Sequence, residues 1–273
     1  MRSTLALITL AVVAPLSAQG IRPSSLRVRQ STDQSLDTYQ PPEYHPVRPG
    51  EVRSSGFLSE MASLPLGRLL GPVDPQLVSS AQTPEVVFTG AIVAVVPPAG
   101  AAYKRGDTVL FVTVMQGPRG WGDIVVPTGL ARIGEQNPRQ TLATVLEMYG
   151  PIRAGQGVLP LDPVADPGAV QPVPAAGPTS EIIASREPRD VAQPGMVMFA
   201  SMGRAAGIRV GDFVQIRRHA GPRLNSADTI DDLVAVAQVV HVGEKSCTIK
   251  LTRVIDPDIR PGTPVVRVAT LPG

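Results

Sequence analysis

Short runs of alternating apolar and polar residues, separated by glycine and proline, make up most of this chain. The clearest pattern covers 204–216. It begins with a helical turn that ends at Gly207, which can adopt the positive φ of a helix stop. A tight turn at Gly211-Asp212 follows, and Phe213 and Gln215 then alternate with Val214 and Ile216, the period of a half-buried strand. A weaker copy covers 102–112, with Gly106-Asp107 at the turn.

The same patterns place a first domain at 66–162. Strands are predicted over 67–70, 85–89 and 108–115, and a hairpin pairs 129–133 with 141–148 before a closing turn at 152–157. The run 108–115 is almost continuously apolar, which is typical of a strand covered on both faces.

Residues 179–273 repeat this order. Strands are predicted over 181–183, 197–199 and 213–216, a hairpin pairs 233–242 with 248–255, and a turn at Gly262 leads into the last strand. Six correspondences in the same order indicate a tandem duplication. The predicted fold class is therefore all-β, with two duplicated small β-barrel or sandwich domains. A proline-rich segment at 163–178 joins them, either as an extended linker or as an ordered segment that crosses the two domains.

The N-terminal residues predict export. Arg2 precedes a short apolar run, and the small residues that end at Ala18 are typical of a signal-peptide cleavage site, so residues 1–18 are expected to be removed. Residues 19–65 are polar and rich in proline, which predicts a disordered or extended leader. The expected location is the periplasm or the extracellular space, with no integral membrane segment left after cleavage.

Composition narrows the function classes. Aromatic residues make up only 4% of the chain, so the core must consist of Val, Ile, Leu and Ala. The net charge of +2 gives no argument for a nucleic-acid partner. The single cysteine, Cys247, excludes an intrachain disulfide and a cysteine-rich metal site, and it is expected to be a buried strand residue.

The sequence offers no pattern for a catalytic, metal or cofactor site. Asp107 and Asp212 occupy equivalent turns, where an aspartate commonly accepts hydrogen bonds from nearby backbone amides. The three histidines are far apart, and the acidic cluster at 228–232 lacks the glycine and closing glutamate of a calcium loop. Trp121 stands between two glycines and is the best single candidate for stacking on a sugar or peptide; the alternative is a plug at the end of a barrel.

Four segments carry a family resemblance: 203–214, 236–242, 248–254 and 259–262. In these, the second domain resembles the β-barrel repeats of secreted bacterial LysM-containing proteins, and it is similar to the C-terminal domain of the flagellar ring assembly protein T. The resemblance implies a barrel fold and an envelope location, and it carries no catalytic residues. Residues 44–52 are only faintly similar to a LysM opening, with one residue too many, so a LysM module is not expected.

Together these observations predict a non-catalytic, exported cell-envelope protein that acts as a scaffold or binding module, with peptidoglycan or envelope proteins as expected partners and no cofactor. One alternative is a PDZ-like peptide-binding module, because PDZ domains carry a segment similar to 206–214. Another is a hydrolase with an unrecognised site. A barrel closed by its last strand would exclude the PDZ alternative.

Overall fold

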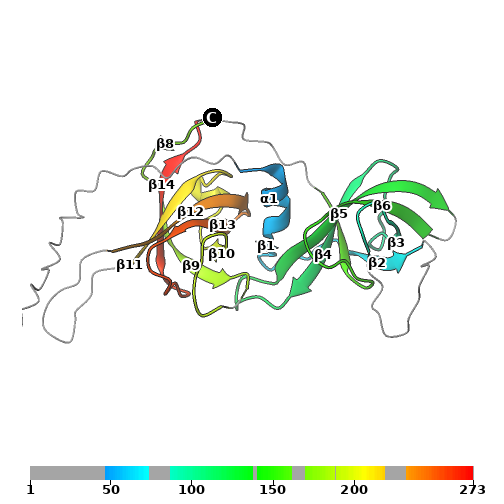
Figure 1. Ribbon diagram of the computed structural model, residues 1–273, viewed down its shortest axis with the longest axis horizontal. Helices are drawn as coiled ribbons and strands as arrows, with labels where there is room; N and C mark the ends of the chain where they lie inside the picture. The colour runs from blue at the N-terminus through cyan, green and yellow to red at the C-terminus, as the bar shows by residue number, and fades with distance from the viewer. Residues whose placement is uncertain are drawn as a thin grey trace, which may run out of the picture. The chain divides into compact units, whose positions relative to one another are not determined.

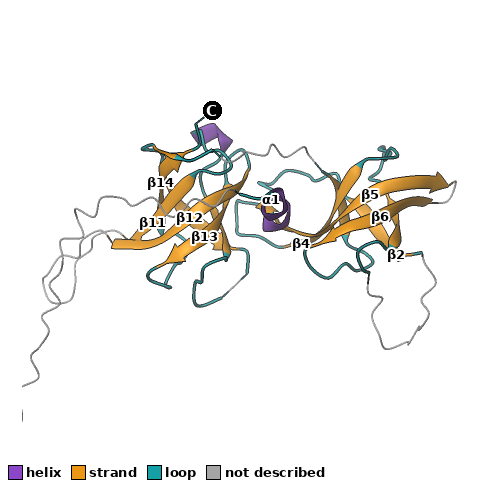
Figure 2. Cartoon of the chain, turned by 45° about the horizontal axis from the view of Figure 1, so that its top comes forward, coloured by secondary structure: helices purple, strands orange, loops and turns teal. Residues whose placement is uncertain are grey.

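Strands dominate the folded part of the chain (Figure 2). The computed structural model describes residues 47–73, 87–137, 140–161, 170–187, 189–218 and 232–272. These residues form fourteen strands, one α-helix, α1 (Pro49–Ser55), and one short 3-10 helix, η2 (Arg204–Ala206). The predicted all-β fold is therefore confirmed.

The first sheet closes on itself through six strands (Figure 1). β5 pairs with β4, β4 with β7, β7 with β2, β2 with β3, β3 with β6, and β6 again with β5, all antiparallel. A short seventh strand, β1, adds to β5 through Phe57 and Leu58. The strands are β1 (Phe57–Leu58), β2 (Gly67–Pro72), β3 (Ile92–Val96), β4 (Thr108–Met115), β5 (Ile124–Asn137), β6 (Gln140–Met148) and β7 (Gly157–Pro160).

The second sheet closes in the same order. β12 pairs with β11, β11 with β14, β14 with β9, β9 with β10, β10 with β13, and β13 again with β12. We call the rings β2–β7 and β9–β14 the first and second barrel. The strands of this sheet are β8 (Val173–Pro174), β9 (Thr179–Ser185), β10 (Val197–Ala200), β11 (Phe213–Arg218), β12 (Asp232–Val242), β13 (Cys247–Val254) and β14 (Pro264–Thr270).

Each barrel is filled by small and branched aliphatic side chains, as the low aromatic content predicts. Val93, Val109, Ala131 and Val145 belong to the core of the first barrel, with Phe111 as one of its few aromatic members. The core of the second barrel is built in the same way. Such residues fit the narrow interior of a six-stranded ring.

Strand β4 is apolar on both sides, and both sides are covered in its first part, over 109–112. Val109 and Phe111 belong to the core of the first barrel, whereas Leu110 and Val112 belong to a separate cluster on its outer side. Phe57 packs on that outer cluster. The prediction that 108–115 is a strand is confirmed, and two covered faces are found over 109–112, where a segment from outside the barrel supplies the second cover. Val114 and Met115 at its end are exposed.

Three expectations differ from the structure, and others fall on residues that it does not describe. The strand predicted at 85–89 is wrong: β3 begins at Ile92, because the chain turns between Phe88 and Ala91 with Gly90 at a φ of 89°. Residues 47–65, predicted as leader, include α1 and β1, and residues 173–174 of the predicted linker pair with β14. The acidic residues Asp228 and Asp231 lie outside the described residues, as do His45, His219, the predicted signal peptide and most of the leader.

Candidate functional site

The two Gly-Asp turns identified in the sequence have the same geometry. Gly106 and Gly211 have φ angles of 94° and 93°, in the region that favours glycine. The carboxylate of Asp107 accepts a hydrogen bond from the amide of Lys104 at 2.7 Å, and that of Asp212 accepts one from Arg209 at 3.0 Å. Each aspartate therefore stabilises its own turn, as the sequence predicts.

Asp212 has a second role in the fold of the second barrel. Its side chain is fully buried, and its Oδ1 atom accepts a hydrogen bond from Thr270 at 2.7 Å. Arg267 lies 3.7 Å from the same carboxylate and also donates to the carbonyl of Gly207, whose φ of 76° ends η2. These bonds join the turn to β14, the strand that closes the ring. Gly262 precedes that strand with a φ of 87°.

Trp121 is half-buried in an apolar cluster. It packs with Leu58, Ile124 and Phe199, which come from β1, β5 and β10. Its carbonyl accepts a hydrogen bond from the amide of Glu60 at 3.0 Å. The indole thus contributes to packing between elements of both barrels, which leaves less of its face for a ligand.

A segment that the sequence did not single out organises this region. We call residues 47–66 the strap. Val52 of its helix, α1, and the preceding Val47 pack on Val240 of the second barrel. Its strand, β1, pairs with β5 of the first barrel. The strap therefore contacts both barrels within twenty residues.

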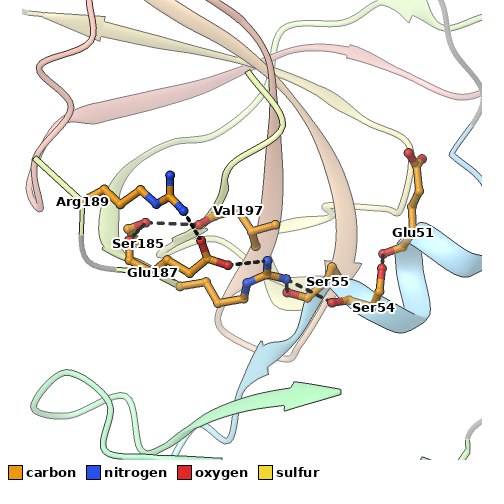
Figure 3. Close-up of polar contacts among 8 residues, drawn as sticks. Glu51, Ser54, Ser55, Ser185, Glu187, Arg189 and Val197 are labelled. Atoms are coloured by element: carbon orange, nitrogen blue, oxygen red, sulfur yellow. Dashed lines mark hydrogen bonds and ion pairs between the residues drawn. The ribbon is translucent and has the colours of Figure 1, made fainter. Parts of the chain in front are cut away.

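Polar contacts fix both ends of α1 to the second barrel. Lys250 donates to Glu51 at 2.7 Å, and Arg186 donates from Nη1 to the carbonyls of Ser54 and Ser55, each at 3.0 Å. These two carbonyls belong to the last turn of the helix, where no intrahelical donor is available. Figure 3 shows this end of α1, with Glu187 close by; Glu187 pairs with Arg186 at 3.0 Å.

Glu60 makes the densest set of contacts in the strap. Its carboxylate accepts hydrogen bonds from the amides of Glu244, Lys245 and Ser246 and from the Ser246 hydroxyl, at 2.7–3.2 Å. The acceptor is charged and the three amides belong to one turn between β12 and β13, so this arrangement is an anion-binding nest filled by the chain's own side chain. Burial alone would raise the pKa of Glu60, but these hydrogen bonds outweigh it and hold the pKa below its ordinary value.

The backbone at this point is strained. Glu60 and Met61 have φ angles of 52° and 66°, the only positive values for non-glycine residues in the described part of the chain. This left-handed conformation costs roughly 1 kcal/mol for each such residue. Strain persists only where surrounding contacts impose it, and the nest around Glu60 supplies such contacts.

Beside the strap lies a cleft of about 390 Å³. Its apolar lining includes Val52, Phe57 and Leu64 from the strap and Leu110 and Leu159 from the first barrel. We call this space the strap cleft. Its volume lies in the range typical of small-molecule sites, and its apolar walls with a few polar groups are also typical of them.

Three side chains with nitrogen donors complete the lining: Arg53, Arg204 and His241. The His241 ring stacks on Phe57, with centroids 5.0 Å apart and planes inclined by 18°. Arg53 lies 3.6 Å from Glu147, and Arg204 lies 3.5 Å from Glu244. Among the described residues that line the strap cleft, none is acidic.

Sequence reasoning missed the residues that build this site. Glu60, Arg186 and Arg53 are single charged residues without a motif, and their partners lie in distant segments. Arg204 stands within the Gly203–Gly207 turn pattern, but that pattern gave it no binding role.

Other chemistry is not brought together in the part of the chain that the structure describes. No three His, Cys, Asp or Glu side chains there form a group that could hold a metal ion. Burial raises the pKa of the Cys247 thiol to about 12. No helix among the described residues is long and apolar enough to cross a membrane. The chain matches no family model, and a search of curated proteins finds no significant match.

Proposed function

We propose that this chain is an exported, non-catalytic protein of the cell envelope that works as a binding module, with the strap cleft as its ligand site. The observation that carries the proposal is the cleft itself, which is apolar, bordered by two arginines and built by a segment fixed to both barrels. Export rests on the signal-peptide pattern of residues 1–18.

A binding role fits the way the site is held. The strap is tied to the second barrel through Glu51, Glu60 and Arg186 and to the first through β1, so the cleft walls are preorganised. Preorganised walls lower the entropy lost when a ligand binds. The carboxylates of Asp107 and Asp212 are used in turns.

The shared strand order of the two barrels supports the proposal that the chain arose by duplication. A closed second ring argues against the PDZ-like alternative, because β14 pairs with both β9 and β11. A PDZ domain needs a strand edge that is free to accept a peptide.

Peptidoglycan is the envelope partner that we propose to test first. Cell fractionation of the full-length chain should recover it in the periplasm or the medium, and deletion of residues 2–18 should retain it in the cytoplasm. The protein should then sediment with purified peptidoglycan sacculi.

Two matched variants locate the contact. Leu161→Trp adds bulk to a residue that lines the strap cleft, whereas Leu70→Trp adds the same bulk to an exposed position on β2. Loss of sedimentation in Leu161→Trp alone would support the strap cleft as the contact. Equal sedimentation of both variants would assign peptidoglycan binding to another surface, and retention of the full-length chain in the cytoplasm would refute the envelope role.

A further inference from the structure

We propose that the strap cleft binds the carboxylate end of a medium-chain fatty acid, with the acyl chain on the apolar walls and the carboxylate at the arginines. This inference rests on the proposed function, because it takes the strap cleft as the ligand site. It names a fatty acid as the occupant of that cleft and leaves peptidoglycan to another surface, so loss of peptidoglycan sedimentation in Leu161→Trp would count against it. Three features of the described lining lead to it: its apolar surface, its charge and its lack of main-chain partners.

The apolar surface comes from two parts of the chain. Phe57 and Leu64 of the strap line the cleft together with Leu110 and Leu159 of the first barrel, and these side chains pack in one cluster. Each methylene group of an acyl chain that moves from water onto these side chains favours binding. The lining is thus suited to a flexible hydrocarbon chain.

The charge of the lining selects an anion. Arg53 and Arg204 line the strap cleft, and both of their ion pairs, at 3.6 Å and 3.5 Å, are longer than the 2.7 Å pair of Lys250 with Glu51. Arg204 also donates to the carbonyl of Val242 at 3.4 Å, and Arg53 forms a hydrogen bond with Tyr149. The Nε atom of Arg53 is buried and has no hydrogen-bond partner among the described residues, so this donor is left for a ligand. A carboxylate matches the forked donors of an arginine.

On the first-barrel side of the strap cleft, the backbone argues against a peptide as the occupant. Strands β4 and β7, which contribute Leu110 and Leu159, are each paired on both sides within the first barrel. They offer no free edge to an added strand. Pro65, Pro127 and Pro160 also line the space, and proline has no amide hydrogen to donate. A ligand without peptide groups does not need these backbone hydrogen-bond partners, so their absence does not weaken its binding.

Isothermal titration of the purified full-length chain with dodecanoate tests the proposal. Dodecyltrimethylammonium carries the same chain with the opposite charge, and acetate carries the carboxylate without the chain. We expect saturable 1:1 binding of dodecanoate, and at least about tenfold weaker binding of both other probes, since a charge-assisted hydrogen bond and a buried chain each contribute at least that factor.

Variants then locate the site. Arg204→Gln should weaken dodecanoate binding about tenfold. Arg260→Gln, which changes another highly exposed arginine outside the strap cleft, should leave it unchanged. Leu161→Trp should abolish binding and Leu70→Trp should not, with far-UV circular dichroism showing that each variant is folded. Equal affinity for the anionic and cationic probes, or unchanged binding in both Arg204→Gln and Leu161→Trp, would overturn the proposal.

The two proposals fail in different experiments. Export and peptidoglycan sedimentation test the envelope function and do not involve a fatty acid. Absence of dodecanoate binding by a chain that is exported and sediments with peptidoglycan would refute the ligand class alone. Binding of dodecanoate by a chain that stays in the cytoplasm would refute the envelope function alone.

Discussion

Removal of the Glu60 carboxylate should weaken the attachment of the strap to the second barrel. Glu60→Ala leaves the amides of Glu244, Lys245 and Ser246 without their acceptor. A hydrogen bond to a charged group contributes about 1.5–3 kcal/mol, but this turn is partly exposed and water can replace part of the loss. We therefore expect the free energy of unfolding to fall by about 2 kcal/mol in total.

Urea unfolding followed by circular dichroism measures this change. A loss of about 2 kcal/mol corresponds to a fall in melting temperature of roughly 4–8 °C for a chain of this size. Glu181→Ala, which removes an exposed carboxylate from β9, is the matched control and should change stability by less than about 0.5 kcal/mol.

Limited proteolysis gives a local readout. Cleavage near residues 60–66 should become faster in Glu60→Ala than in the wild-type protein, because local opening of the strap requires less free energy. If Glu60→Ala changes neither stability nor the cleavage rate more than the control, the carboxylate does not fix the strap and the argument from its hydrogen bonds is wrong.

Three further predictions concern the strap and the turns. The pKa of Glu60 is lowered, so the contribution of its carboxylate to stability is present above the ordinary pKa of 4.5 and is lost as the pH falls below that value. Glu60→Gln should flatten this pH dependence in urea midpoints taken between about pH 3 and pH 6. Met61→Gly should raise stability by about 0.5 kcal/mol in the same assay, because the exposed Met61 has a φ of 66°, and a loss would show that its side chain contributes. Gly211→Ala should lower the free energy of unfolding by about 2–3 kcal/mol, and Gly106→Ala by only about 1 kcal/mol, because both glycines have a φ near 94° but only Gly211→Ala places a methyl group against Leu271. Equal losses in the two variants would contradict this difference.

The strands could be predicted because their signals are local. The alternation in 108–115 and 213–216 and the turn residues at Gly211 and Gly262 are properties of neighbouring positions, and the observed β4, β11 and β14 follow from them. The one strand placed wrongly, at 85–89, has a buried Val87 and an exposed Phe88 like a strand, but it ends in a turn at Gly90. The local pattern alone did not distinguish this turn-forming segment from a strand.

The strap could not be predicted for a physical reason. The partners of Glu60 lie up to 186 positions away, and those of Arg186 lie about 130 positions away. A pattern within a short window contains no information about such contacts. The left-handed backbone at Glu60 and Met61 is likewise imposed by tertiary contacts, since neither residue type favours it.

Native mass spectrometry of the protein recovered from the envelope or medium fraction tests whether the strap cleft holds a ligand. We expect the wild-type chain and Leu70→Trp to carry a small bound molecule, and Leu161→Trp to carry none. A bound mass that persists equally in Leu161→Trp, or a wild-type chain without any bound molecule, would contradict the assignment of the strap cleft as the ligand site.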